Sequence, residues 1–376
     1  MPLPAAPHFL LDQPYQKRDV LIRVGPEGAN QGGRPPGLLL HWGQVHDEGV
    51  KGDAASGSQL APLMASPGAA RYERDKIGGH KEAASWIRRK APSTHAEWDT
   101  TVDEAIVAQQ LLGTAGLIVP TRLLAQADWP DGLQETLDAA RRAAARHPTT
   151  DMSVNLILDE RWIRDSRLRR TLLNQFTDLP EGIGAAVHIH WSAPDVPDRS
   201  ASLEALRVVV SALAGDGRRV LLVEAGRLGW LAIAWGAWGF TAGLSGASWT
   251  RNTAVVRRAK GQPATRIARV FEPNLLQHVR QAVHTRLLGQ SGYQPCPCGF
   301  CQRQAASGGW SHDLSGQHAL YALSRLTEQV AAPTLQERRA RIRIIVQNAI
   351  NFEAGLSFRL TGDSRPMHLP EWLAQL

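Results

Sequence analysis

Cysteine is scarce in this chain, since only three of its 376 residues are cysteines. A chain of this length can bury a full hydrophobic core, and we expect it to do so without disulfide bonds. Residues 1–20 lack the basic start and the long apolar run of a secretory signal peptide. We therefore expect a cytoplasmic protein whose thiols stay reduced.

Long hydrophobic runs are also missing. A membrane-spanning helix needs about 18 or more consecutive apolar residues. The nearest approach, LGWLAIAWGAWGFTAGL at 228–244, is rich in glycine and directly follows Arg227. We interpret this segment as a buried part of a barrel and expect no association with a membrane.

Acidic residues are fewer than basic ones, and the chain carries a formal net charge of +7. Such a balance suits a polyanionic partner, because lysine and arginine bind phosphates and release counterions. A generally arginine-rich proteome would give the same balance, so both explanations stay open. Basic residues gathered in two runs favour the nucleic-acid interpretation more than evenly spread ones would. The first group is Arg251, Arg257, Arg258, Lys260, Arg266 and Arg269, and the second is Arg338, Arg339, Arg341 and Arg343.

Short apolar segments alternate with helical ones along the chain, which favours a mainly parallel sheet. The expected strands are 19–24, 37–42, 115–120, 153–158, 184–191, 218–225 and 239–245, with a weaker one at 266–272. The expected helices are Val102–Leu112, Leu133–Ala145, Trp162–Phe176, Ser202–Ala214 and Leu228–Trp238.

About eight strands favour an α/β fold of the (β/α)8 TIM-like barrel type. An open doubly wound sheet is the second choice, because no glycine-rich phosphate fingerprint follows the first strand. We assign the barrel to residues 1–290, with a long loop at 43–92, and a zinc-binding subdomain with closing helices to 291–376. A loop of this length in a compact domain is usually functional or disordered.

All three cysteines lie within the segment QPCPCGFCQR, as Cys296, Cys298 and Cys301. Reduced thiols this close together favour a metal, and a fourth ligand would complete the tetrahedral site that zinc prefers. His312 and His318 are the candidates, and we choose His318 because it opens the expected helix HALYALSRLTEQV. Four protein ligands leave no place for water, so the sequence predicts a structural Zn²⁺; three unliganded cysteines are the alternative.

The pattern Cys-x-Cys-x2-Cys, followed by a histidine that opens a helix of the form H-x-L-Y-x-L, resembles the zinc subdomain of the tRNA-guanine transglycosylases. The later segment RIRIIVQNAINFEAGLSF resembles the stretch that follows in that family. The resemblance covers roughly residues 296–358. It implies a zinc-bearing (β/α)8 barrel that exchanges guanine in a nucleic acid for a 7-deazaguanine.

The same resemblance implies an aspartate nucleophile on a late strand, in a motif like F-D-C-V-x-P-T-R, and a second aspartate as general acid and base. The matching region here, GFTAGLSGASWTRN at 239–252, contains no carboxylate. Neither T-D-S-G-G-F-Q nor G-G-L-x-x-G-E is present, and VEAGRLGW is only a faint echo of the latter.

Three hypotheses follow. The first is a diverged transferase that acts on guanine or 7-deazaguanine in tRNA or DNA with a relocated carboxylate. The second is a non-catalytic, zinc-stapled barrel that binds nucleic acid and assists a catalytic partner, as a homo- or heterodimer. The third is an unrelated barrel on which a zinc loop arose independently.

Polar residues at the carboxyl ends of barrel strands face the active site. Asp159 and Glu224 are the candidate catalytic carboxylates, against the alternative that each only pairs with a nearby arginine. His190 and Arg122 are the candidate substrate-binding residues. The wider set at these strand ends is His41, Arg122, Asp159, Glu160, His188, His190, Glu224 and Ser245.

His188 and His190 alternate in AAVHIHW and therefore share one face of a strand. They could bind a second metal or a phosphate, or simply be hydrogen-bonded inside the barrel. Asp99 and Asp103 precede an expected helix, and we interpret them as acidic residues at its N-terminal cap.

Overall fold

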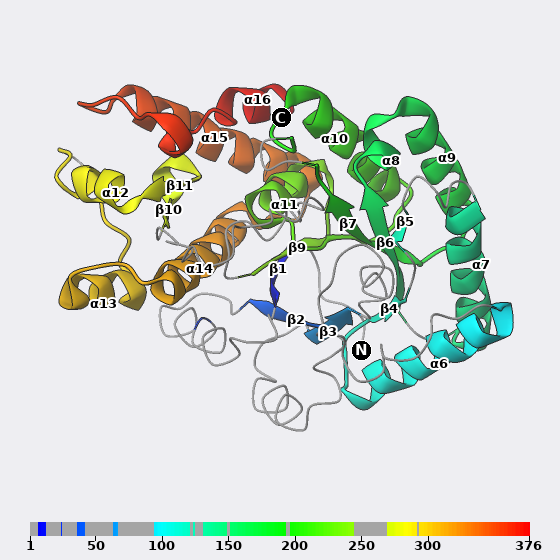
Figure 1. The fold of residues 1–376 in the computed structure, drawn as a ribbon. Coiled ribbons are helices and arrows are strands. Elements are labelled where there is room, and N and C mark those ends of the chain that lie inside the picture. The colour runs from blue at the N-terminus through cyan, green and yellow to red at the C-terminus, as the bar shows by residue number, and fades with distance from the viewer. Residues whose placement is uncertain are drawn as a thin grey trace, which may run out of the picture.

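The computed structural model describes residues 7–12, 24, 36–41, 63–66, 94–120, 123–124, 131–148, 151–192, 196–243, 269–291 and 293–376. Its main feature is a sheet of nine strands with helices along much of its outer side (Figure 1). The strands are β1 (His8–Asp12), β2 (Gly37–His41), β3 (Leu63–Ser66), β4 (Leu117–Val119), β5 (Leu123–Leu124), β6 (Met152–Asp159), β7 (Gly184–His190), β8 (Val220–Leu222) and β9 (Gly239–Ala242).

The strands of this sheet lie in chain order, and every pairing is parallel. The order runs β4-β6-β7-β8-β9-β1-β2-β3, with β5 also paired to β6, so the last strand lies beside the first. An open doubly wound sheet would reverse its order at a switch point, and this sheet does not. The predicted parallel α/β sheet is therefore confirmed.

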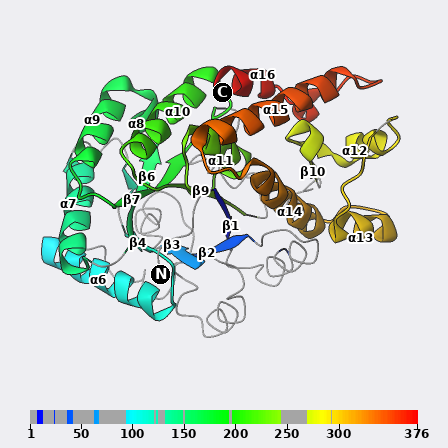
Figure 2. The same ribbon diagram turned by 180° about the vertical axis from the view of Figure 1, so that it is seen from behind.

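The sheet curls so that its two ends come close together (Figures 1 and 2). Cα atoms of β3 and β4 approach within 8 Å. No ladder between them joins the ends within the described part of the chain. The structure therefore shows a curled, barrel-like sheet rather than a fully closed barrel.

Helices follow several of the strands and lie on the outside of the sheet (Figure 2). They are α6 (His95–Leu111), α7 (Asp131–Arg146), α8 (Arg161–Arg164), α9 (Ser166–Thr177), α10 (Ser200–Gly215) and α11 (Gly226–Ala232), which continues as η2 (Ile233–Trp235). The expected helix Trp162–Phe176 is split, because Asp165 accepts hydrogen bonds from the amides of Arg167 and Leu168 and caps α9.

The two faces of the strands pack into separate apolar clusters. Outward side chains such as Leu11, Val187 and Phe240 pack in one cluster with the helices. Inward side chains form a smaller cluster within the curl: Leu10, Leu39, Met64, Ile118, Ala186, Leu221, Val223 and Trp238. The alternation along each strand therefore decides which residues can face a site inside the sheet.

Three predicted elements need correction or fall outside the described residues. The segment 43–92 is not all loop, because β3 lies within it and pairs with β2. The strand expected at 19–24 lies outside the described residues except for Val24, whereas β1 occupies His8–Asp12. The strand expected at 266–272 is β10 (Arg269–Glu272), which pairs antiparallel with β11 (Gln277–Arg280) in a separate sheet.

The capping role predicted for Asp99 and Asp103 is wrong. Thr94 caps α6 in a capping box with Glu97, so both aspartates lie inside the helix. Asp99 instead accepts from Arg142 Nε at 2.9 Å, and Asp103 accepts from Arg146 at 2.9 Å, which ties α6 to α7.

The C-terminal part consists of the β10–β11 pair and a group of helices. These are η3 (Pro273–Leu275), α12 (Gln281–Leu288), α13 (Gly299–Ser307), α14 (His312–Val330), α15 (Leu335–Ala354), η4 (Gly362–Ser364) and α16 (Leu369–Ala374). Helix α14 packs against β10, β1 and α11, so this part lies directly against the curled sheet. The boundary placed between residues 290 and 291 stays a prediction.

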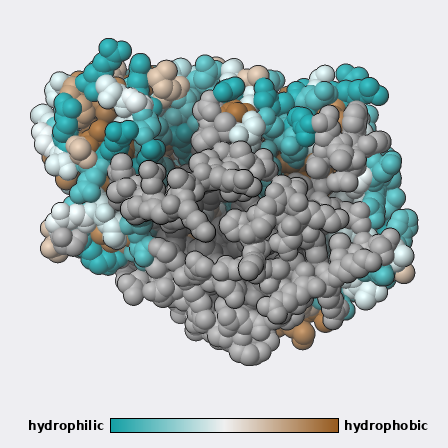
Figure 3. All heavy atoms as spheres, viewed as in Figure 1, coloured by the Kyte–Doolittle hydropathy of each residue, from teal (hydrophilic) through white to brown (hydrophobic). Residues whose placement is uncertain are grey.

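The surface over the described elements is mainly hydrophilic in the view of Figure 3. In the part of the chain that the structure describes, the large apolar side chains that are exposed are Val107, Leu111, Leu288, Ile344 and Met367. Among the described residues, no helix has the length and apolar character that a membrane crossing requires.

Candidate metal centre and strand-end site

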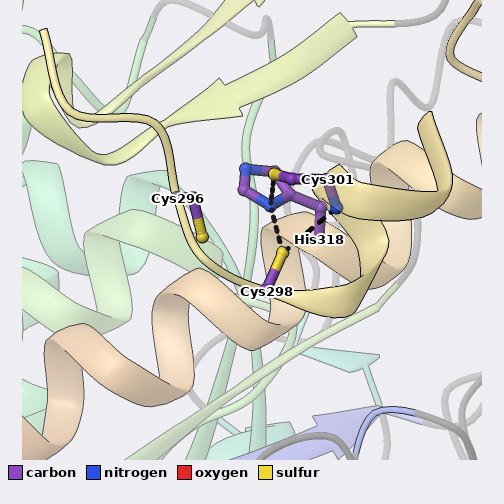
Figure 4. A group of neighbouring side chains, drawn as sticks. All are labelled: Cys296, Cys298, Cys301 and His318. Carbon is purple, nitrogen blue, oxygen red and sulfur yellow. Dashed lines mark hydrogen bonds between the residues drawn. The ribbon is translucent and has the colours of Figure 1, made fainter. Parts of the chain in front are cut away.

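Cys296, Cys298, Cys301 and His318 come together between the loop before α13 and the helix α14 (Figure 4). One ligand atom from each residue lies within 4.8 Å of all the others. Cys298 and His318 are buried, while Cys296 and Cys301 are partly exposed. The four residues predicted as ligands therefore form one compact group that could bind a metal ion.

Local backbone structure explains the spacing of the thiols. Cys298 caps α13, and its sulfur accepts a hydrogen bond from the Cys301 amide at 3.4 Å. Because a cap and the third helical residue lie on the same side of the first turn, Cys-x2-Cys brings the two sulfurs together. Pro297 separates Cys296 from this turn, and Cys296 approaches from the incoming loop.

His318 lies in the second turn of α14, which begins at His312, so the prediction that His318 opens the helix is wrong in that detail. His312 occupies the helix start and is not part of the cluster. Within the described residues, the Cys3His group is the only set of three or more such side chains close enough to share a metal ion.

The imidazole of His318 is oriented by the neighbouring strand. Its Nε2 donates to the carbonyl of Phe271 in β10 at 2.8 Å. Nδ1 therefore faces the thiols, at 3.4 Å from Cys298 Sγ and 3.5 Å from Cys301 Sγ. A backbone carbonyl on the distal nitrogen is the usual way in which a metal-binding histidine is fixed in one tautomer. Trp310 lies against the ring, with a centroid distance of 5.3 Å.

The side chains of the cluster shift one another's pKa values. Hydrogen bonds with Cys298 and Cys301 hold the pKa of Cys296 well below its ordinary value. Burial lowers the pKa of His318, but hydrogen bonds with Cys296 and Cys298 raise it to about 10. Hydrogen bonds with Cys296 and Cys298 raise the pKa of Cys301. A thiolate beside an imidazole is the donor chemistry that a borderline-soft cation binds.

A second buried polar group supports the loop that carries Cys296. Glu272 at the end of β10 is fully buried, and it accepts from the Tyr293 hydroxyl at 2.6 Å and from Asn274 Nδ2 at 2.9 Å. Burial and the nearby Glu272 carboxylate raise the pKa of Tyr293. Sequence reasoning missed this pair, because nothing in the spacing of Glu272 and Tyr293 distinguishes it.

The two predicted catalytic carboxylates, Asp159 and Glu224, have different surroundings in the structure. Asp159, at the end of β6, accepts from both the amide of Arg161, at 3.1 Å, and its guanidinium Nε, at 2.7 Å. This is the alternative of a loop carboxylate paired with an arginine. Glu160 accepts from the amide and hydroxyl of Ser192, at 3.0 and 2.9 Å, and so joins the ends of β6 and β7.

Glu224, in contrast, is buried directly after β8 and faces a histidine. Its Oε2 lies 3.3 Å from His188 Nε2, and only 5% of the residue is exposed. The rings of His188 and His190 are 4.9 Å apart, and His190 is also buried. Among the predicted strand-end residues, the structure therefore brings together Glu224, His188 and His190.

The remaining candidates cannot be placed. Arg122 and Ser245 lie outside the described residues, and only the backbone of His41, at the end of β2, is described.

Fold and cluster together define a parallel α/β protein with a curled sheet and a Cys3His group that could bind a metal. No protein-family model matches the chain, and no curated protein is significantly similar to it. The resemblance to the tRNA-guanine transglycosylases therefore stays a prediction.

Proposed function

We propose that the chain is a closed (β/α)8 barrel stapled by a structural zinc ion, and that it exchanges guanine in a nucleic acid. Three features support the barrel. The strands follow chain order, β9 pairs with β1, and β3 approaches β4. Because β4 and β5 both pair with β6 in parallel, they act together as one interrupted strand, which makes eight in all.

The donor set supports zinc rather than a harder cation. Zinc bonds of about 2.3 Å to sulfur and about 2.0–2.1 Å to nitrogen, at tetrahedral angles, place the two ligand atoms about 3.5 Å apart. The distances from His318 Nδ1 to Cys298 and Cys301 are 3.4 and 3.5 Å. With four protein ligands, the ion would hold the loop before α13 on α14 and would leave no position for a reacting water.

The observation that carries the catalytic proposal is the position of Glu224. The late strand β9, where the resemblance implies a nucleophilic aspartate, has the sequence GFTA and no carboxylate. The Glu224 amide donates to Thr241 Oγ1 of β9 at 2.7 Å. The end of the neighbouring strand therefore supplies a buried carboxylate beside the place where one is missing, and a barrel site tolerates such a relocation.

Charge supports a nucleic-acid substrate, although not every arginine of the second basic group is available for it. Arg339 Nε donates to the Ala234 carbonyl at 3.1 Å, and Arg341 donates to the Ala331 carbonyl at 2.6 Å. These two side chains anchor α15. Arg343 is exposed on the same helix and is the better candidate for a phosphate contact. The first basic group lies outside the described residues apart from Arg269.

The test is incorporation of radiolabelled guanine into unmodified tRNA and into duplex DNA by the purified protein. We expect incorporation into one of the two, and its loss in Glu224→Gln. Asp159→Asn is the matched control, because Asp159 is held by Arg161 and should not react. No incorporation into either nucleic acid by the wild-type protein would contradict the proposed activity.

The absence of a carboxylate from β9 favours a second candidate, a non-catalytic barrel that binds nucleic acid for a catalytic partner. Binding of tRNA without exchange, with an affinity that falls steeply with salt, would support it. A homo- or heterodimer is part of this proposal, and the size of the complex in solution would test it.

A further inference from the structure

Glu224 departs from the alternation of the strand that precedes it. Val223 lies inside the curled sheet with Ala186. Because successive side chains of a strand point to opposite faces, Glu224 would be expected to point outward, at the helices. A φ of 52° instead turns its carboxylate inward. It meets His188, which shares the inward face with Ala186 because the two residues alternate along β7.

The left-handed backbone of Glu224 is held by β9. The amide of Glu224 donates to Thr241 Oγ1 at 2.7 Å, and the amide of Ala225 donates to the Thr241 carbonyl at 2.9 Å. A residue with a Cβ is disfavoured in this conformation, whereas glycine adopts it readily. A glutamate kept in a strained conformation that glycine would relieve is typical of functional sites.

The pair is enclosed. The exposed fractions of the side chains are 13% for His188 and 6% for Glu224. Removal from water strengthens the interaction between a carboxylate and an imidazolium. Two other titratable groups lie at the ends of β6 and β7: His190, whose ring is 4.9 Å from that of His188, and Asp159, which pairs in register with His190 and is held by Arg161.

We propose that Glu224 and His188 form the reacting dyad of the exchange, with Glu224 as nucleophile and His188 as proton donor and acceptor. This role rests on the proposed function. The substrate it requires is a purine attached through N9 to a ribose or deoxyribose C1′, presented at the carboxyl ends of β7 and β8.

In the first half of the reaction, a carboxylate oxygen of Glu224 forms a bond to C1′ and the C1′–N9 bond breaks. The electron pair of the broken bond leaves with guanine, which takes a proton from the His188 imidazolium. In the second half, neutral His188 takes the N9 proton of the incoming 7-deazaguanine. N9 then bonds to C1′, and the ester bond breaks with its electron pair returning to Glu224.

The pair itself is tested by following the His188 ring nitrogens by NMR in full-length, histidine-labelled protein. The signal is assigned by its loss in His188→Gln. We expect Glu224→Gln to change the chemical shift of His188 Nε2, because this nitrogen loses the carboxylate oxygen that lies 3.3 Å away. Asp159→Asn should leave that chemical shift unchanged. A His188 Nε2 signal that is the same in Glu224→Gln and wild type overturns the dyad.

The reacting roles are tested with tRNA and with duplex DNA under denaturing conditions. We expect a covalent adduct between wild-type protein and nucleic acid that maps to Glu224 by mass spectrometry. It should be absent from Glu224→Gln and present in Asp159→Asn. His188→Gln should slow exchange by about 10²–10⁴-fold and flatten its pH profile.

The outcomes separate the two proposals. Exchange by wild type that survives Glu224→Gln overturns the dyad and leaves the proposed function standing. No exchange by wild type overturns the proposed function and the reacting roles together, while the NMR comparison still decides whether Glu224 and His188 interact.

Discussion

Replacement of Cys298 by serine is the sharpest test of the metal centre. Cys298 is fully buried, and its sulfur lies 3.4 Å from His318 Nδ1. A serine hydroxyl is a poor zinc ligand, so the ion would be lost or bound much more weakly. The buried imidazole and the two remaining thiols would then lack the cation that satisfies them.

The expected loss of stability can be estimated from this geometry. Removing one member of a buried charged group costs about 3–5 kcal/mol, because its partners are left uncompensated. The unfolding entropy near the transition is about 2.1 cal/mol/K per residue. For 376 residues this is about 0.8 kcal/mol/K. A loss of 3–5 kcal/mol therefore corresponds to a fall in Tm of about 4–6 °C.

The assay is zinc content by elemental mass spectrometry, together with thermal unfolding of wild type and variant. We expect about one zinc per chain in the wild type and much less in Cys298→Ser. His312→Asn is the control, because His312 lies on the same helix outside the cluster and should leave both values unchanged. A wild type with less than about half an equivalent of zinc, or a Cys298→Ser variant with unchanged zinc and Tm, would refute the reasoning.

Four other predictions follow from the described residues. Burial, and then the nearby Arg227 cation, lower the pKa of His368, so this histidine stays neutral when folded. Its contribution to stability should be constant above about pH 6.5 and fall below it, and His368→Gln should reduce that fall in acid-unfolding curves. Glu224→Gly should be about 1 kcal/mol or more stable than Glu224→Ala in denaturant unfolding, since only glycine relieves the left-handed backbone; equal stabilities would contradict the strain. Gly229→Ala should destabilise the protein by about 1–3 kcal/mol, because the added Cβ would lie 2.4 Å from Cβ of Phe240; an unchanged Tm would show that the helix can shift. Arg343→Ala should weaken tRNA binding and reduce its salt dependence without changing Tm, and an unchanged affinity would exclude Arg343 from the interface.

Much of the architecture could be read from local patterns. The runs at 153–158 and 184–191 predict β6 and β7 closely, because buried parallel strands are nearly continuous apolar segments. The four metal-binding candidates could also be named, because three thiols within one short segment leave few possible partners. In both cases the signal lies within a short stretch of chain.

Other elements depended on contacts between distant segments. The segment LMAS at 63–66 is too short for its sequence to predict a strand, and it forms β3 by pairing with β2. RVFE at 269–272 has the composition of a barrel strand but pairs with β11 instead. Asp99 and Asp103 look like capping residues until α7 brings Arg142 and Arg146 beside them.

The sequence by itself determined the parallel α/β class and the thiol-rich segment, since both follow from local periodicity and spacing. Only the tertiary structure distinguished Asp159 from Glu224. Both carboxylates lie at the end of an apolar segment, and the neighbouring residues do not distinguish them. In the structure, Arg161 holds the carboxylate of Asp159, whereas a left-handed backbone turns the carboxylate of Glu224 toward His188. That difference arises because Thr241, from the adjacent strand, holds the Glu224 backbone in a conformation that local propensity disfavours.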